Sequence, residues 1–224
     1  MRRKTSILLK LLTVVFSFGG VILSFVGAEA DGYSHWSKRL LYFTGLSNIA
    51  IGICMLLLLA LAFGSASLRA TRNIYILRYV FTVSITVTAL IFCAVLAPFS
   101  HRDGYNAFTL SSLMTHVLAP SLAIADMFVD RVRVRILRRH TLISLIPLLA
   151  YLVFASALIL MKVDFGRGDP YPYVFLNYYS PAGIFGFSNQ MPYIFGSFYW
   201  MVLITLIVIG IERLYARLYN RSII

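Results

Sequence analysis

Two polar side chains, Thr44 and His116, stand out chemically from an otherwise apolar setting. His116 lies in the apolar run over 109–129, and Thr44 lies near the start of the run over 40–63. A threonine hydroxyl is a poor nucleophile until a base removes its proton, and neutral imidazole is the side chain best suited to do so near neutral pH. The pair therefore has the chemistry of a threonine nucleophile and a histidine base, provided that the fold brings the two together.

Two further polar residues follow Thr44 in the same run. Asn48 comes four positions later and shares a helical face with Thr44, and Ser47 precedes it. We expect Asn48 or Ser47 to donate a hydrogen bond to the oxyanion that forms when the hydroxyl attacks a carbonyl. The alternative is that they bond a backbone carbonyl or a neighbouring helix, as polar residues in membranes often do.

The helical face of His116 also holds Ser112, four positions before it, and Pro120, four positions after it. Pro120 has no N–H to donate, so it leaves the carbonyl of His116 without its usual partner, and such a kink often opens a polar pocket. No carboxylate lies at a similar depth in its run. We therefore expect a backbone carbonyl or Ser112 to orient the imidazole.

Composition identifies the class of protein. The 224 residues are 60% hydrophobic and 12% charged, whereas soluble proteins have about 25% charged residues. A run of about 20 apolar residues can cross a bilayer. Six such runs occur, over 7–27, 40–63, 76–97, 109–129, 142–161 and 191–211. They predict an all-α integral membrane protein in which residues 1–224 form one bundle of six transmembrane helices.

The basic residues predict the orientation of the bundle. Most of the 20 lysines and arginines precede the first run, connect the second and third, or follow the fourth and sixth. Because positive residues concentrate on the cytoplasmic side, we expect both termini in the cytoplasm. The net charge of +12 is then a topology signal that also contacts anionic headgroups, so we expect membrane lipids, and no nucleic acid, as partners. Asp126 lies near this end as a structural acid, with candidate partners Arg78, Arg131 and Arg133.

The connection over 162–190 is too aromatic for a solvated loop, with Tyr171, Tyr173 and Phe175 within five positions. One alternative is a segment of the aromatic belt that lies in the membrane interface. The other is a re-entrant or capping segment over the outer mouth of the bundle. In the second case these three aromatics would line a substrate cavity together with Tyr42 and Pro120.

Several kinds of site are not supported by the sequence. It contains no HExxH motif, no Cys/His cluster with metal-ligand spacing and no GxSxG motif. Gly166-Arg167-Gly168 has neither a preceding strand nor a third glycine, so it does not predict a nucleotide site. We therefore expect no metal and no cofactor.

Three stretches, taken in order, resemble a known family. They are Tyr42-Phe43-Thr44 with Ser47-Asn48, then Thr115-His116 with Pro120 and Asp126, then Tyr-Pro-Tyr-Val-Phe-Leu over 171–176 before a Pro-Ala-Gly turn. Their order and spacing, from the second helix to the sixth, are similar to those of the androgen-induced-gene family of six-helix transmembrane threonine hydrolases and its predicted bacterial relatives. The animal members cleave fatty acid esters of hydroxy fatty acids. This chain departs from them in its short loops and in an aspartate where they have glutamate.

The resemblance implies that Thr44 and His116 are the catalytic pair. It also implies a substrate of the fatty acyl ester class, cleaved through an acyl-threonine intermediate, and a location in the bacterial cytoplasmic (inner) membrane. Two other functions are compatible with the residues themselves: a binder, carrier or channel that does not turn its ligand over, and a structural subunit whose polar residues only pack helices. Nothing in the residue pattern indicates the oligomeric state.

Overall fold

The computed structural model describes residues 2–64, 68–99, 106–130, 134–191 and 193–222. In these ranges the regular elements are helices, apart from an isolated bridge between Phe187 and Phe195. Six helical segments are long and apolar enough to cross a membrane: Arg3–Val26, Phe43–Phe63, Thr71–Leu96, Leu110–Val129, Arg138–Leu160 and Ser197–Ser222. The all-helical fold and the six candidate spans are thus confirmed.

The first two spans are the helices α1 (Arg2–Val26) and α2 (Phe43–Phe63). The third is α3 (Leu68–Ile91), which continues through the π-helical turn η2 (Phe92–Leu96) into α4 (Ala97–Phe99). The fourth consists of α5 (Leu110–Leu113), the π-helical turn η3 (Met114–Leu118) and α6 (Ala119–Val129). The fifth is α7 (Arg138–Ser144) with α8 (Ile146–Leu160), and the sixth is α9 (Ser197–Ser222). Two short 3₁₀ helices, η1 (Trp36–Leu41) and η4 (Val174–Leu176), lie in connections.

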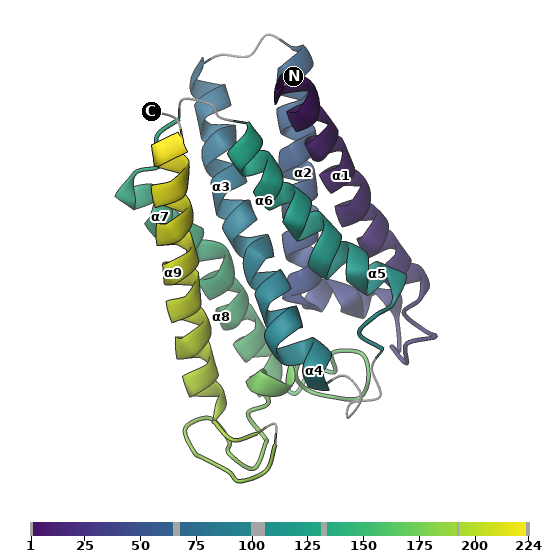
Figure 1. Ribbon diagram of the computed structural model, residues 1–224. Coiled ribbons are helices and arrows are strands. Elements are labelled where there is room, and N and C mark those ends of the chain that lie inside the picture. The colour runs from purple at the N-terminus through teal and green to yellow at the C-terminus, as the bar shows by residue number, and fades with distance from the viewer. Residues whose placement is uncertain (1, 65–67, 100–105, 131–133, 192, 223–224) are drawn as a thin grey trace.

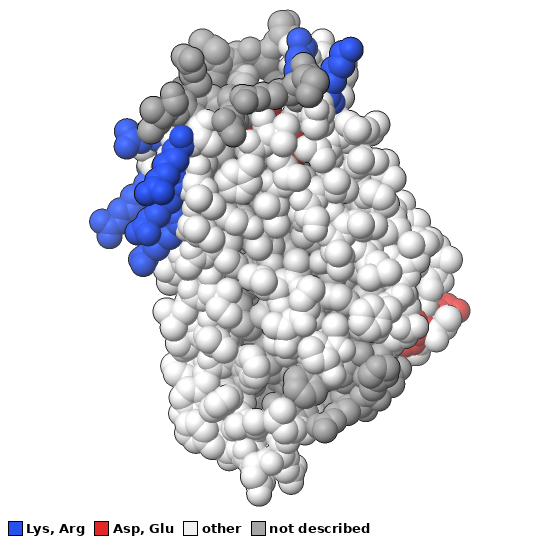
Figure 2. Space-filling view, viewed as in Figure 1, with Lys and Arg blue, Asp and Glu red and all other residues white. Residues whose placement is uncertain are grey.

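The helices form one bundle, in which α1, α2, α3 and α6 pack together and α7, α8 and α9 pack on the side of α3 (Figure 1). Both termini lie at one end of the bundle, and α4, α5 and the long connection before α9 lie at the other. On the face shown in Figure 2, the lysine and arginine side chains gather at the end with the termini, and the middle of the molecule is uncharged. On this face, the surface between the basic and acidic side chains is mostly uncharged, which suits a bilayer core.

The last span differs from its predicted range of 191–211. The apolar run ends at Ile211, but α9 continues to Ser222. Glu212, the first residue beyond the run, is buried and accepts a 2.7 Å hydrogen bond from the Ser144 hydroxyl. Residues before Ser197 belong to the connection, where the N–H of Gly196 bonds the carbonyl of Gly186. The other boundaries differ from the predicted ones by a few residues.

Glycine allows α1 to approach the fourth span closely. A Cβ atom on Gly20 would lie 2.6 Å from the Cγ2 atom of Thr115 and 2.9 Å from the Cβ atom of Met114. Small residues permit such close contacts between membrane helices. The turn that carries His116 is therefore held directly against the backbone of α1.

Asp126 lies in a buried ionic cluster near the end of the bundle that holds the termini. Its carboxylate accepts hydrogen bonds from Ser6 and Lys10, each at 2.8 Å, and from Arg78 at 3.2 Å. Lys10 and Arg78 also pair with Asp130, at 2.7 and 3.0 Å. Asp126 is thus a structural acid with Arg78 as partner, and Lys10 is a second, unforeseen one. The candidate partners Arg131 and Arg133 lie outside the described residues.

Candidate active site

The structure brings Thr44 and His116 together. Thr44 lies in the first turn of α2, and His116 lies in the middle of η3, both at the end of the bundle away from the termini. The Thr44 hydroxyl oxygen is 3.2 Å from Nε2 of His116. His116 is 7% exposed. The separation is short enough for a hydrogen bond, which is the geometry that a nucleophile and its general base require.

The hydrogen bond of His116 Nδ1 determines the protonation state of Nε2. Nδ1 lies 2.9 Å from the main-chain carbonyl of Ser112, which can only accept a hydrogen bond, so Nδ1 carries the proton. The hydroxyls of Ser112 and Thr115 lie 3.3 and 3.1 Å from the same nitrogen. Nε2 is then unprotonated, and its lone pair faces the Thr44 hydroxyl. The Ser112 carbonyl thereby fixes the tautomer of a base, a role that a carboxylate has in many triads.

His116 contacts a residue of a second π-helical turn. The ring of Phe92, the first residue of η2, stacks on the imidazole with ring centroids 4.2 Å apart and an interplanar angle of 18°. His116 itself belongs to η3. Such π-turns are rare and are frequent at functional sites. Sequence reasoning missed Phe92, because an apolar residue in an apolar helix gives no sign of a changed hydrogen-bonding register.

The π-register also changes the role expected of Pro120. In η3 the N–H of Ala119 bonds the carbonyl of Met114, five residues back. In the same register the group that Pro120 cannot bond is the carbonyl of Thr115 rather than that of His116. The side-chain amide of Asn48 donates to this Thr115 carbonyl at 3.1 Å.

Asn48 and Ser47 are not placed as oxyanion donors. The amide group of Asn48 donates its second hydrogen bond to the carbonyl of Thr44 at 2.9 Å, so both of its protons are committed to the backbone. The Ser47 hydroxyl bonds the same Thr44 carbonyl at 3.1 Å and the Thr88 hydroxyl at 2.8 Å. Both residues therefore hold α2 in position against its neighbours, the alternative that membrane packing favours.

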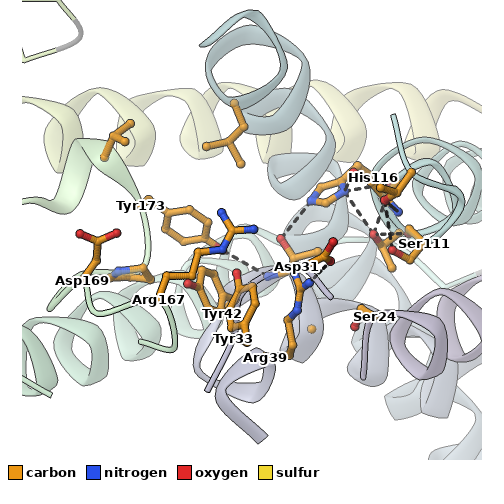
Figure 3. Close-up of a pocket in the computed structure, with 18 of the residues that line it drawn as sticks. Ser24, Asp31, Tyr33, Arg39, Tyr42, Ser111, His116, Arg167, Asp169 and Tyr173 are labelled. Carbon is orange, nitrogen blue, oxygen red and sulfur yellow. Dashed lines mark hydrogen bonds and ion pairs between the residues drawn. The ribbon is translucent and has the colours of Figure 1, made fainter. Parts of the chain in front are cut away.

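Thr44 and His116 line a cavity of about 460 Å³. Its walls include residues of α1, η1, α2, α5, η3 and the long connection, and Figure 3 shows Ser24, Arg39, Ser111 and Tyr173 around it. Tyr42, Ser112 and Tyr171, three of the residues predicted for the site, also line it. Charged residues of both signs lie in the wall, among them Asp31, Arg39, Arg167 and Asp169. The volume is in the range of small-molecule binding sites, and these four charged residues come from the connections at this end of the bundle.

Thr44 also lines a second, smaller space of about 30 Å³. Apolar side chains of α3, α8 and α9 form most of its wall, including Val87, Leu148 and Ile204. Phe175 and Leu176 of η4 close it. Thr44 and Tyr173 line both spaces.

The long connection has two parts, one that caps the bundle and one with exposed aromatic side chains. Residues 165–176 cap the bundle: Phe165 is fully buried, and the Tyr42 hydroxyl bonds its carbonyl at 3.3 Å. By contrast, Phe185, Phe187 and Phe195 lie exposed on the second part. The first part therefore forms a wall of the site, and the second has the exposed aromatic surface typical of a membrane interface.

Tyr173 lies closest to the nucleophile among the capping residues. Its hydroxyl oxygen accepts a hydrogen bond from the main-chain N–H of Thr44 at 3.4 Å. Burial raises the pKa of Tyr173 to about 12, against the lowering effect of hydrogen bonds from Thr44. The phenol is therefore neutral at physiological pH and has a proton to donate. Its stacking on Phe175, with ring centroids 5.1 Å apart, fixes the ring.

The remaining predicted residues lie elsewhere. Pro120 is buried in the first turn of α6 and is not among the residues that line the two described spaces, so it is not a cavity residue. Asp126 belongs to the ionic cluster at the other end of the bundle. Among the described residues there is no group of three or more His, Cys, Asp or Glu side chains that could hold a metal ion.

Comparisons of the chain with protein-family models, with curated proteins and with solved structures found no match. The resemblance to the androgen-induced-gene family therefore stays a prediction from the three sequence stretches.

Proposed function

We propose that this protein is a membrane-embedded hydrolase that cleaves a lipid ester of the fatty acyl class, with Thr44 as nucleophile and His116 as general base. The observation that carries the proposal is the 3.2 Å separation of the Thr44 hydroxyl oxygen and His116 Nε2 in the wall of a cavity of about 460 Å³. Buried polar groups in a membrane bundle are costly and are a sign of function.

The first half of the reaction forms an acyl-enzyme. The Thr44 oxygen attacks the ester carbonyl carbon while Nε2 of His116 takes the hydroxyl proton. The tetrahedral intermediate then collapses, the bond between the carbonyl carbon and the alcohol oxygen breaks, and the imidazolium gives its proton to the leaving alcohol. The Ser112 carbonyl, 2.9 Å from Nδ1, stabilises the imidazolium that exists between the two proton transfers.

The second half returns the enzyme to its starting state. A water molecule in the alcohol's place loses a proton to Nε2 and attacks the acyl-threonine carbonyl. The bond to the Thr44 oxygen breaks, the proton passes from Nε2 to that oxygen, and a carboxylic acid leaves. Each half uses the same base, so no second titratable group is required.

Tyr173 is the best placed donor to the oxyanion that forms in both halves. Its neutral hydroxyl lies beside the main-chain N–H of Thr44. Thr44 is in the first turn of α2, where N–H groups have no intrahelical partner and the helix dipole favours negative charge. This assignment replaces Asn48 and Ser47, whose protons are committed to other partners.

The proposal includes a location and an orientation. The basic residues at the start of α1, at the start of α3, between α6 and α7 and in the last turns of α9 favour the cytoplasm for the end that holds both termini. The site then opens toward the outer leaflet, from which a lipid substrate enters. The resemblance to the predicted bacterial relatives favours the bacterial cytoplasmic (inner) membrane as the location. It also favours a place for the protein among the androgen-induced-gene hydrolases.

A fluorophosphonate probe, which labels activated hydroxyl nucleophiles, tests the proposal on the purified protein in detergent. We expect labelling of the wild type and of Thr44→Ser, and none of Thr44→Ala or His116→Ala. Thr86→Ala is the matched control, because Thr86 is also a buried hydroxyl but bonds Thr82 and Tyr215 away from the site. Absence of labelling in a folded wild type would leave a binder, carrier or channel, or a structural subunit.

A further inference from the structure

Thr44 lines two spaces of opposite character. One is the cavity of about 460 Å³, whose wall includes Arg39 and Arg167. The other is the crevice of about 30 Å³, lined mostly by aliphatic and aromatic side chains. An ester also has two sides, an acyl chain and an alcohol. Because Thr44 lines both spaces, an ester whose carbonyl carbon lies at its hydroxyl can place one side in each space.

The crevice is suited to an acyl chain and unsuited to a polar group. Its wall includes the side chains of Val87, Leu148, Leu176 and Ile204, each of them buried. The hydroxyl of Tyr151, which also lines it, already donates to the carbonyl of Leu41 at 3.1 Å. A polar group in such a place would lose its hydrogen bonds to water without replacement, which costs about 1–3 kcal/mol.

The cavity is suited to the alcohol side. The wall includes the ion pair of Arg39 with Asp31, the charged side chains of Arg167 and Asp169, and hydroxyls at Ser24 and Ser111. An alcohol with hydroxyl or charged substituents would find partners there. The leaving alcohol also has to collect its proton from Nε2 of His116, which lines the cavity and not the crevice.

The size of the crevice limits the length of the acyl chain. A single water molecule needs roughly 10–15 Å³ by the same measure, so about 30 Å³ holds an acyl group of only a few carbons. We infer that the substrate belongs to the short-chain end of the proposed fatty acyl class, with an acyl group of a few carbons in the crevice beside Thr44 and a larger, polar alcohol in the cavity. This inference rests on the proposed esterase function. It adds an orientation of the bound ester, with the acyl group in the crevice and the alcohol in the cavity.

Acyl-chain selectivity tests the crevice. The substrates are p-nitrophenyl acetate, butanoate and octanoate, and the variant Ile204→Ala removes part of the crevice wall. In Ile204→Ala we expect the ratio of kcat/KM for octanoate to kcat/KM for acetate to rise about tenfold or more, which is the discrimination that one or more methylenes provide. In Ile204→Phe we expect the ratio of kcat/KM for butanoate to kcat/KM for acetate to fall. Ile159→Ala is the matched control, because Ile159 is equally buried in the same core but lines neither space.

Alcohol selectivity tests the cavity. The variant Ser24→Leu narrows the cavity from α1, whereas Thr44 belongs to α2. We expect this variant to lose activity on glycerol triacetate relative to ethyl acetate, about tenfold, measured as released acetic acid, with its acyl-chain profile unchanged. The reverse pattern, in which Ile204 variants change alcohol selectivity and Ser24→Leu changes acyl selectivity, would overturn the assigned direction of binding.

The outcomes separate the two proposals. If the wild type hydrolyses no ester above the level of Thr44→Ala, the esterase function itself is wrong. If Thr44-dependent hydrolysis is present but the Ile204 variants match Ile159→Ala in their chain-length profile, the esterase stands and the crevice is not the acyl site. Probe labelling of Thr44 in each variant shows that it is folded.

Discussion

Asn48 donates a hydrogen bond to the main-chain carbonyl of Thr115 across the contact between α2 and η3, at 3.1 Å. The other amide proton of Asn48 bonds the carbonyl of Thr44, at 2.9 Å. One fully buried side chain thus joins the backbone of the proposed nucleophile to the residue that precedes the proposed base. The bond to Thr115 exists because Pro120 has no N–H to offer that carbonyl in the π-register.

Removal of this link is expected to lower activity. In Asn48→Leu, which keeps the volume but removes both donors, the buried Thr115 carbonyl loses its side-chain partner and the Thr44 carbonyl keeps the Ser47 hydroxyl. The free energy of unfolding falls by about 1–3 kcal/mol. The turnover of the folded protein falls by about 100-fold, because a displacement of about 1 Å between reacting groups has that effect. Thermal unfolding and ester hydrolysis in detergent measure the two quantities.

Asn220→Leu is the control for this effect. Asn220 also bonds the backbone with its side-chain amide, to the N–H and carbonyl of Ile136, but does so at the other end of the bundle. We expect a loss of stability with unchanged turnover of the folded fraction. Equal turnover in Asn48→Leu and Asn220→Leu would show that Asn48 has no positioning role.

The hydroxyl of Tyr173 is expected to act on the transition state. Tyr173→Phe removes only the hydroxyl, and kcat should fall by about 100- to 1,000-fold, the effect of losing one oxyanion donor, with KM nearly unchanged. Tyr179→Phe removes a hydroxyl from the same connection, where it bonds the Ile159 carbonyl at 2.9 Å away from both spaces. A similar loss of kcat in both variants would contradict an oxyanion role for Tyr173.

The buried ionic cluster is expected to control stability and not catalysis. Asp126→Ala leaves Lys10 and Arg78 short of a partner in a buried site, which destabilises proteins by about 3–5 kcal/mol. Asp130→Ala should have a smaller effect, since the Asp130 side chain is 20% exposed and water can replace it, whereas that of Asp126 is 0% exposed. The midpoints of thermal unfolding in detergent give the order, and an equal or reversed order would count against it.

The six spans could be predicted because each is a run of apolar residues of the right length. The end of α9 could not, because the burial of Glu212 depends on Ser144 of another helix. The same holds for Lys10, which pairs with a residue 116 positions away. Its charge gives no sign of its partner, which is fixed only when the helices pack.

The candidate site was predictable to a similar degree. Thr44 and His116 could be selected because polar residues are rare in apolar runs, and their similar depth made a contact possible. Their chemistry depends on features without a sequence signal, since Phe92 and the two π-turns look like ordinary apolar helix. The donor roles expected for Asn48 and Ser47 were wrong for a related reason. The acceptor of an amide or hydroxyl proton depends on which main-chain carbonyls lack a partner within their own helix.

The cap over the site is expected to be sensitive to acid through Asp164. Burial raises the pKa of this carboxyl, but the main-chain N–H groups of Gly166 and Gly168, at 2.7 and 2.8 Å, outweigh burial and lower it below 3.8. A carboxylate whose pKa is depressed on folding stabilises the protein above its unfolded pKa and loses this effect as the pH falls through its folded pKa. Stability should therefore decline below about pH 4 in the wild type.

Asp164→Asn isolates this contribution, because an amide of the same shape cannot ionise. At neutral pH the variant should unfold at a lower temperature than the wild type, and the difference should shrink as the pH falls below 3.8, since protonated Asp164 also loses its charge. Melting temperatures from neutral pH to pH 3 in detergent give the two curves. Asp169→Asn serves as the control, as Asp169 lies in the same connection and its main-chain carbonyl, which the substitution retains, bonds Phe165. Parallel curves for the wild type and Asp164→Asn would show that the Asp164 carboxylate does not hold the cap.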